Sequence, residues 1–202
     1  MELTYVAYEE IKRIRELDCS NVERTRLFAT LSRINTLYMI MQAGSGHIGS
    51  SFSAMDIVSW LYLNEMELAE DPDADGDIYF SSKGHDAPGY YSVLLGLGRL
   101  DFSLIHELRR LNGLPGHPDV EVPGVQANTG SLGMGISKAK GMVLAHRLQN
   151  KKAKVYVLTG DGELQEGQFW ESLASAVHLG MSEITAIIDH NKIQSDTWVS
   201  LV

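Results

Sequence analysis

The feature that most constrains the fold is a pair of short, largely apolar runs near the end of the chain. Residues 155–158 (VYVL) and 184–188 (ITAII) carry no charge and are rich in β-branched residues. Such runs are typical of strands buried on both faces of a parallel sheet. The helical pattern of residues 168–179 lies between them, which makes a strand, helix, strand unit with a right-handed crossover. We therefore expect an α/β fold, with a parallel β-sheet flanked by helices.

The rest of the chain is predicted to be mainly helical. Helical spacing of apolar residues predicts helices over residues 8–18, 21–42, 53–66 (capped by Ser53), 88–97, 103–111 and 132–149. Asn21 is the expected N-cap of the second helix. Its expected core-facing stripe is Leu27, Leu31, Ile34, Leu37, Tyr38 and Met41. In the last of these helices, small residues are expected to let another backbone approach closely: Gly133, Gly135, Ser137, Ala139 and Gly141.

Three further segments complete the secondary-structure prediction. Residues 78–80 form a short strand candidate before a polar turn. Residues 70–77 (EDPDADGD) are interpreted as a solvated loop, because they lack the spaced ligands of a calcium-binding EF-hand. Residues 112–130 are punctuated by glycine and proline, and a connection this long inside a compact domain is often functional.

Composition bounds the class of protein. The chain has 202 residues, so we expect one domain over residues 1–202. Its 26 acidic and 17 basic residues give a net charge of −9, which argues against nucleic-acid binding. No apolar run is long enough to cross a membrane, and the first 18 residues do not resemble a signal peptide. The single cysteine, Cys19, excludes an internal disulfide framework. We expect a soluble, cytoplasmic protein.

The candidate chemistry lies where the two buried strands end. Asp161 follows the first strand and Asn191 follows the second. Because ligands of open α/β sheets bind at the carboxyl ends of strands, these two side chains are expected to converge. Carboxylate and carboxamide oxygens suit Mg²⁺ or Ca²⁺, and Gly160 and Gly162 would let a diphosphate approach the backbone. The alternative is a plain turn followed by an ordinary strand-end asparagine.

The two commonest phosphate-binding motifs are missing from the sequence. It has no GxxxxGK[ST] segment and no GxGxxG directly after a strand. Residues 130–135 (GSLGMG) have other glycine spacings, but the helix that follows them could bind an anion at its N-terminus.

Five motifs make the sequence resemble the transketolase family of thiamine-diphosphate enzymes. They are Ser45–His47 (SGH), Ser82–His85 (SKGH), Pro115–Pro118 (PGHP), Thr129–Gly133 (TGSLG) and Gly160–Gly167 (GDGELQEG). Together with Asn191 they follow one another in the order of the family. The resemblance implies the diphosphate-binding domain fold of transketolase.

The resemblance also implies roles for individual residues. Asp161, Asn191 and the backbone carbonyl of Ile193 would hold Mg²⁺ (or Ca²⁺) together with the diphosphate of thiamine diphosphate. The implied cofactor-binding residues are His85, Gly130, Leu132, Asp161, Gly162 and Asn191.

Four residues would be catalytic by the same resemblance. His47, His85 and His117 would face the active-site cleft, where imidazoles bind the cofactor and sugar hydroxyls and move protons. Glu166, with Glu171 beyond it, resembles acidic residues that link two active sites across the family dimer. The alternative for these glutamates is a favourable position near a helix N-terminus. The other histidines are taken as structural: His106, His146, His178 and His190.

The implied activity is transfer of a two-carbon ketol unit from a ketose phosphate to an aldose phosphate. The family needs a second, pyrimidine-binding domain, so we expect a partner subunit that supplies it, and a domain that is incomplete at its C-terminus. A homo- or hetero-oligomer is expected. Phe169, Trp170 and Val177 could form a dimer face or belong to the core.

Two departures from the family pattern bear on the sugar substrate. Ile48 replaces the proline that commonly follows the SGH segment, and Asp86–Pro88 differs from the usual run after SKGH.

Three alternative functions stay open. The first is a subunit of another thiamine-diphosphate enzyme, of the 1-deoxyxylulose-phosphate synthase or 2-oxoacid dehydrogenase type. The second is a non-catalytic interaction or regulatory subunit with the same fold. The third is a metal-dependent phosphate-binding module, which would not explain the three histidine motifs.

Overall fold

The computed structural model describes residues 3–69, 76–194 and 197–201. They fall into two compact units. The first, which we call the helical unit, comprises residues 1–66 and 85–124, and the second, the sheet unit, comprises residues 67–84 and 125–202. Because a compact unit need not fold on its own, the single domain over residues 1–202 stays a prediction. Most of the predicted acidic loop, residues 70–75, lies outside the described residues.

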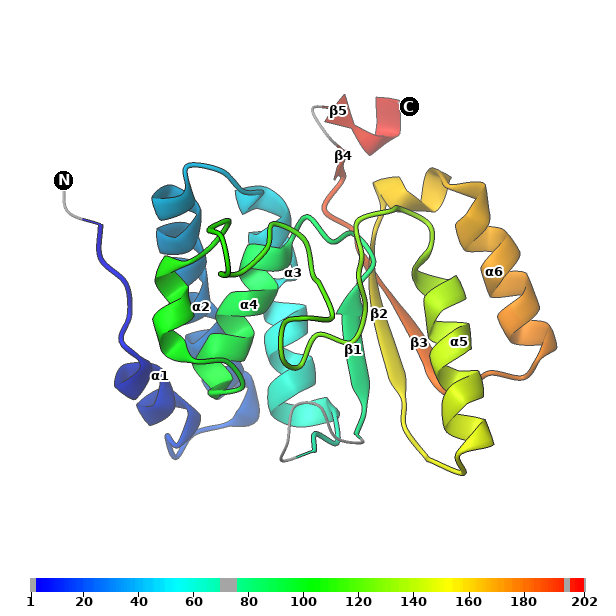
Figure 1. Cartoon of the computed structure of the whole chain (residues 1–202), viewed down its shortest axis with the longest axis horizontal. Coiled ribbons are helices and arrows are strands. Elements are labelled where there is room, and N and C mark those ends of the chain that lie inside the picture. Colours follow the sequence, from blue (N-terminus) through cyan, green and yellow to red (C-terminus); the bar gives the residue numbers. More distant parts are fainter. Residues whose placement is uncertain (1–2, 70–75, 195–196, 202) are drawn as a thin grey trace. The chain divides into compact units, whose positions relative to one another are not determined.

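The sheet unit is built on three parallel strands in the order β1-β2-β3 (Figure 1). The strands are β1 (Ile78–Ser81), β2 (Val155–Gly160) and β3 (Ile184–Asp189). Two helices make the crossovers that parallel strands require: α5 (Gly135–Leu148) precedes β2, and α6 (Gly167–His178) joins β2 to β3. The predicted α/β fold with a parallel sheet is confirmed.

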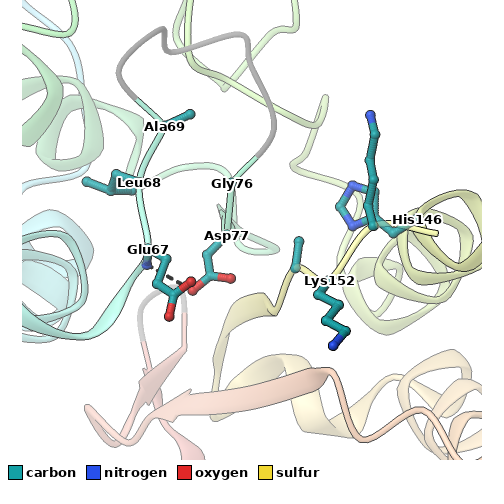
Figure 2. Close-up of a pocket in the computed structure, with 9 residues that line it drawn as sticks. Glu67, Leu68, Ala69, Gly76, Asp77, His146 and Lys152 are labelled. Atoms are coloured by element: carbon teal, nitrogen blue, oxygen red, sulfur yellow. Dashed lines mark hydrogen bonds between the residues drawn. The ribbon is translucent and has the colours of Figure 1, made fainter. Parts of the chain in front are cut away.

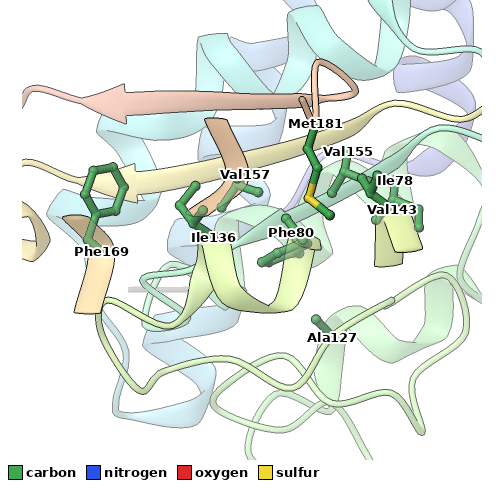
Figure 3. Close-up of a cluster of buried hydrophobic side chains, with 11 residues drawn as sticks. Ile78, Phe80, Ala127, Ile136, Val143, Val155, Val157, Phe169 and Met181 are labelled. Carbon is green, nitrogen blue, oxygen red and sulfur yellow. The ribbon is translucent and has the colours of Figure 1, made fainter. Parts of the chain in front are cut away.

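The core of the sheet unit lies between the sheet and helices α5 and α6 (Figure 3). Alternate residues of β1 and β2 point toward it, because side chains alternate along a strand. The buried members are Ile78, Phe80, Val155 and Val157 from the sheet, Ile136, Ala139 and Val143 from α5, Phe169 and Ala176 from α6, with Ala127 and Met181.

The two predicted buried strands differ in the structure. All six residues of β2 are buried, as expected. In β3, however, Thr185, Ala186 and Ile188 are exposed, and Ile188 retains 45% of its accessible surface. The prediction of a second fully buried strand is therefore wrong, because β3 is the last strand in the sheet order and pairs with β2 alone among the described strands.

Helix α5 shows which small residues serve close packing. A Cβ atom on Gly135 would lie 2.6 Å from the Cβ of Ser82 and 2.8 Å from Cγ1 of Val157. A Cβ atom on Gly141 would meet nothing within 4 Å. The prediction of close approach along the whole helix is thus wrong at Gly141. The helix begins at Gly135 rather than at residue 132, after Gly133 adopts a positive φ of 79°.

The helical unit contains four α-helices in its described residues. They are α1 (Tyr8–Arg15), α2 (Asn21–Ala43), α3 (Ile48–Trp60) and α4 (Ala87–Leu97). A π-helical turn, Leu61–Glu65, continues α3, and a 3₁₀ turn, Phe102–His106, follows α4. Neither α2 nor any other described helix combines the length and apolarity needed to cross a bilayer.

Three predicted helix boundaries are corrected. Ser20, not Asn21, is the N-cap of α2, because its side chain accepts a hydrogen bond from the Glu23 N–H at 3.2 Å. Helix α3 begins at Ile48, so Ser53 lies inside it. The helix predicted over residues 103–111 is only the 3₁₀ turn, because Arg109 and then Asn112 take positive φ angles of 58° and 62°.

The buried face of α2 is not the predicted one. Of the expected stripe, Tyr38 is 5% exposed, but Leu27, Ile34, Leu37 and Met41 are 36–53% exposed. The helix instead packs on α3 and α4 through a face that includes Phe28, Ser32 and Thr36. The Ser32 carbonyl accepts a hydrogen bond from the Ser92 hydroxyl of α4 at 2.8 Å. Apolar residues lie all round α2, so their spacing could not identify the buried side.

Candidate functional site

Asp161 connects the loops that follow β2 and β3. It comes directly after β2, at the start of a 3₁₀ turn, Gly162–Gln165, and is 7% exposed. One carboxylate oxygen accepts a hydrogen bond from the Gly162 N–H at 3.0 Å. The other accepts one from the Lys192 N–H at 2.6 Å, 31 positions further along the chain. The two strand ends are therefore joined at the carboxyl edge of the sheet, where parallel sheets bind ligands.

Asn191 lies in the second of these loops. Its side-chain oxygen accepts a hydrogen bond from the Ile193 N–H at 2.9 Å, and its Nδ2 donates to the Asp189 carboxylate at 3.3 Å. Ile193 begins a short strand β4 (Ile193–Gln194), which pairs with β5 (Thr197–Trp198). Of the three predicted metal ligands, Asp161 and Asn191 thus lie in two adjoining loops, and Ile193 begins the strand that follows the second loop.

The donor atoms in these loops suit a hard divalent cation. A carboxylate, a carboxamide oxygen and a backbone carbonyl are oxygen ligands of the kind that Mg²⁺ and Ca²⁺ take. Within residues 3–69, 76–194 and 197–201, no group of three or more histidine, cysteine, aspartate or glutamate side chains could hold a metal. The donor set therefore fits Mg²⁺ or Ca²⁺ completed by oxygens from another molecule.

Glycine lets two backbone segments meet beside this site. Gly84 has a φ of 72°, and a Cβ atom on it would lie 2.6 Å from the Gly130 nitrogen. Gly130 itself has a φ of 119°, in the region that favours glycine. Leu132, two residues on, is 40% exposed. A side chain at Gly84 would therefore collide with the Gly130 backbone, so the two segments can meet this closely only because residue 84 is glycine.

Glu163 holds this arrangement together and was missed by the sequence analysis. It is 2% exposed. Its carboxylate accepts hydrogen bonds from the Ser82 hydroxyl, from the Gly133 N–H at 2.7 Å and from the Gly160 N–H at 3.3 Å. Burial raises the pKa of Glu163, against the opposing effect of these hydrogen bonds. The only sequence signal was a glutamate inside a glycine-rich strand-end motif.

A buried ion pair adjoins the site and was also missed. The Lys83 ammonium lies 2.8 Å from the Asp189 carboxylate, and the two side chains are 2% and 6% exposed. Lys83 follows β1 and Asp189 ends β3. Because β2 lies between these strands, the pair joins the two outer strands of the sheet at their carboxyl ends.

The three predicted active-site histidines all belong to the helical unit. His47 is the N-cap residue of α3, and its ring centroid lies 5.0 Å from that of His85. The pKa of His117 is lowered mainly by burial and further by electrostatic effects of Arg109 and His47, against an opposing effect of Asp86. His47 therefore lies close enough to both other histidines to interact with them.

Other histidines have contacts of their own. His106, predicted to be structural, has its Nδ1 2.8 Å from the Tyr38 hydroxyl. The Nε2 of His190, also predicted to be structural, lies 4.0 Å from the Asp161 carboxylate, but its side chain is 70% exposed.

The acidic residues of α6 are exposed. Glu166 is the N-cap residue of α6, but its side chain makes no capping hydrogen bond, and Glu171 is also exposed. Of the residues proposed for a dimer face or the core, Phe169 is 3% exposed and belongs to the core. Trp170 and Val177 are 55% and 74% exposed.

A separate cavity in the sheet unit contains none of the predicted site residues (Figure 2). It measures about 360 Å³, and its lining includes Glu67, Asp77, His146 and Lys152. Asp77 accepts hydrogen bonds from the Glu67 N–H at 3.0 Å and from the Lys154 N–H at 2.8 Å. Its carboxylate therefore holds the ends of two segments together.

The parallel sheet, with the loops after β2 and β3 joined at the carboxyl edge of its strands, is typical of α/β domains that bind a ligand at that edge. The sequence profile of the domain described as "Transketolase, thiamine diphosphate binding domain" matches residues 24–202. The chain belongs to the transketolase family, as the sequence motifs predicted.

Relatives and solved structures agree with this assignment. One subunit of the apulose-4-phosphate transketolase from Actinobacillus succinogenes is 36% identical over 183 residues, covering 86% of this chain and 66% of the relative. The 6-deoxy-6-sulfo-D-fructose transketolase subunit SqwG from a Clostridium strain is 36% identical over 174 residues, covering 83% and 62%.

The crystal structure of transketolase from Campylobacter jejuni superposes with a TM-score of 0.79 at 29% identity, covering 92% of this chain and 30% of that one. This chain thus spans no more than about two thirds of the length of these proteins. The predicted fold class, that of the diphosphate-binding domain of transketolase, is confirmed.

Proposed function

We propose that this chain binds the Mg²⁺-diphosphate part of thiamine diphosphate and takes part in two-carbon ketol transfer between sugar phosphates. The observation that carries the proposal is the convergence of Asp161 and Asn191 at the carboxyl edge of the sheet. The Asp161 carboxylate bonds the backbone next to Asn191, in a chain of the transketolase family. Bound thiamine diphosphate supplies the electron-sink chemistry of the transfer.

The proposed metal ligands are Asp161, Asn191 and the backbone carbonyl of Ile193. Mg²⁺ would take its remaining ligands from diphosphate oxygens and water. Further residues proposed to contact the cofactor are His85, Gly130, Leu132 and Gly162. The glycine contact between Gly84 and Gly130 supports this part of the proposal, since it keeps side chains away from the backbone there.

Four residues are proposed to act on the sugar and its protons. His47, His85 and His117 would donate to and accept from sugar hydroxyls. The lowered pKa of His117 supports a neutral imidazole that can accept a proton at neutral pH. Glu166, and Glu171 with it, would form acidic contacts with a second active site, which their exposure permits.

A partner is part of the proposal. Two relatives of this chain are named as subunits of transketolases, which supports an oligomer in which another subunit supplies the pyrimidine-binding domain. The name of one relative contains a sugar phosphate and that of the other a sulfonated sugar. We propose sugar phosphates as the substrates here, and a cytoplasmic location.

Calorimetric titration with thiamine diphosphate tests the proposed function. We expect binding that requires Mg²⁺, is lost in Asp161→Ala, and is retained in Asp56→Ala, a matched control whose carboxylate is exposed and pairs with Arg33 in the helical unit. If the chain is folded by circular dichroism yet binds no thiamine diphosphate, alone or with a pyrimidine-binding partner, the proposal is wrong.

A further inference from the structure

We propose that the buried ion pair Lys83–Asp189 is a positioning device that orients the carboxamide of Asn191 so that its oxygen faces the metal. This inference deepens the proposed function and rests on it. Lys83 and Asp189 would touch neither the sugar nor the metal, and would act through the side chain of Asn191.

Asp189 contacts both proposed side-chain ligands of the metal. Its carboxylate oxygen Oδ2 accepts from Lys83 at 2.8 Å and from Nδ2 of Asn191 at 3.3 Å. Its backbone carbonyl accepts from the N–H of Asp161 at 3.3 Å and from the N–H of Asn191 at 2.9 Å. A residue that is 5% exposed thus sets the position of two loops at once.

The chemistry of Asp189 decides which end of the Asn191 carboxamide points away from it. An ionised carboxylate only accepts hydrogen bonds, whereas a carboxamide has a donating end and an accepting end. Asp189 therefore attracts Nδ2 and repels Oδ1. The oxygen Oδ1 then faces Ile193 and accepts a hydrogen bond from its N–H at 2.9 Å. Since a hard cation is bound through oxygen, a flipped carboxamide would present the wrong atom.

Lys83 makes the buried carboxylate possible. An unpaired carboxylate this deeply buried is strongly unfavourable, and a buried cation at hydrogen-bond distance compensates it. The stem of Lys83 passes beneath the end of β2, where a Cβ atom on Gly160 would lie 3.2 Å from its Cδ. Lys83 belongs to a motif shared with a cofactor-binding family, but its 2% exposure favours positioning over direct contact with a diphosphate.

Two double variants separate positioning from a merely structural role. Lys83→Met with Asp189→Asn removes both charges of the ion pair at nearly constant volume, so neither partner of this pair is left buried without the other. Lys83→Asp with Asp189→Lys keeps a buried ion pair but places an ammonium group beside Asn191, which would attract Oδ1 and turn the carboxamide over. The measurement is a Mg²⁺ titration at saturating thiamine diphosphate, followed by calorimetry, with thermal unfolding of the ligand-free variants as the folding control.

We expect both double variants to need about 10- to 100-fold more Mg²⁺ than wild type, the usual effect of losing a residue that orients a metal ligand. Unchanged Mg²⁺ dependence in Lys83→Met/Asp189→Asn, or wild-type dependence in the exchanged pair, would overturn the inference. If folded wild type binds no cofactor, the proposed function fails first, and the inference fails with it.

If the double variants do not fold, a measurement on the wild-type protein alone still tests the inference. In nuclear magnetic resonance spectra, the side-chain NH₂ of Asn191 should exchange with water at least several-fold more slowly than that of the exposed Asn150, because it donates to a buried carboxylate. Equal exchange at the two carboxamides would contradict the orientation that we propose.

Discussion

Glu163 and Glu166 lie three residues apart in one short segment, yet their surroundings are opposite. Glu163 is buried and accepts three hydrogen bonds from three different segments. Glu166 is exposed at the start of α6. The first is therefore expected to matter for stability, and the second only for contacts that this chain makes with other molecules.

Replacing Glu163 with glutamine tests this difference. In the wild type, the backbone N–H groups of Gly133 and Gly160 each donate to a carboxylate oxygen of Glu163. In the variant, the new NH₂ group would face one of them, so two donors would meet without an acceptor. The free energy of unfolding should therefore fall by about 1–3 kcal/mol. Urea denaturation measures the change. The matched control, Glu166→Gln, should stay within about 0.5 kcal/mol of wild type. Equal effects of the two substitutions would contradict the role assigned to Glu163.

His117 carries a prediction about charge. Burial, and further the electrostatic effects of Arg109 and His47, lower its pKa, so its imidazole should titrate below about 6.5, the ordinary value. Arg109→Ala removes one source of repulsion for the protonated ring, which should raise the pKa of His117 part of the way back. Since burial is the larger cause, the ordinary value should not be reached. Imidazole nitrogen shifts followed against pH provide the measurement, and an unchanged or lower midpoint in Arg109→Ala would be inconsistent with this account.

At the level of elements, small residues in one helix have different reasons to be small. Gly135 of α5 lies against Ser82 and Val157, whereas Gly141 faces open space. Both positions lie in the same helix, so helix propensity affects a substitution at either one equally. A difference between the two substitutions would therefore come from packing.

Alanine at each of these positions tests the packing argument. Gly141→Ala should raise the free energy of unfolding by about 0.5–1 kcal/mol, because alanine favours the helix over glycine. Gly135→Ala should lower it by about 1–3 kcal/mol, because the added methyl group overlaps atoms of Ser82, which follows β1, and of Val157 in β2. Thermal unfolding of both variants gives the comparison. Stabilisation by Gly135→Ala would mean that α5 can move away from the sheet at little cost.

The elements also show how far apolar spacing can predict burial. The continuous apolar runs of β2 and β3 led to the correct parallel sheet, because a strand buried on both faces needs apolar residues at every position. In α2 the predicted stripe was mostly exposed, because Leu27 and Phe28 are both apolar but lie on different sides of the helix. Spacing identified the helix, and packing against α3 and α4 chose its buried side.

For the whole molecule, the exposed strand β3 is the feature with the clearest consequence. It pairs with β2 on one side, and no other described strand pairs with it. Ile188 on β3 is 45% exposed. Exposed apolar strands at a sheet edge favour pairing with other chains, and charged residues there oppose it. We therefore expect this chain to associate with itself as its concentration rises.

Sedimentation velocity over a range of concentrations measures this association. Ile188→Lys should lower the associated fraction at a given concentration. Leu111→Lys is the matched control, because Leu111 is 92% exposed and belongs to the helical unit rather than to the sheet. If the control reduces association and Ile188→Lys does not, the edge of the sheet is not the surface involved.

The sequence by itself determined the parallel α/β class, the family and the residues that we propose as metal ligands. These follow from local patterns: apolar runs with strand character, glycines around Asp161, and five short motifs in a shared order. Only the tertiary structure decided which side of α2 is buried, that β3 is exposed, and that Glu163, Lys83 and Asp189 support the site. Those outcomes depend on contacts between segments as far apart as residues 83 and 189. The sequence alone does not show whether a charged residue is buried, because burial depends on the groups that the fold places around it.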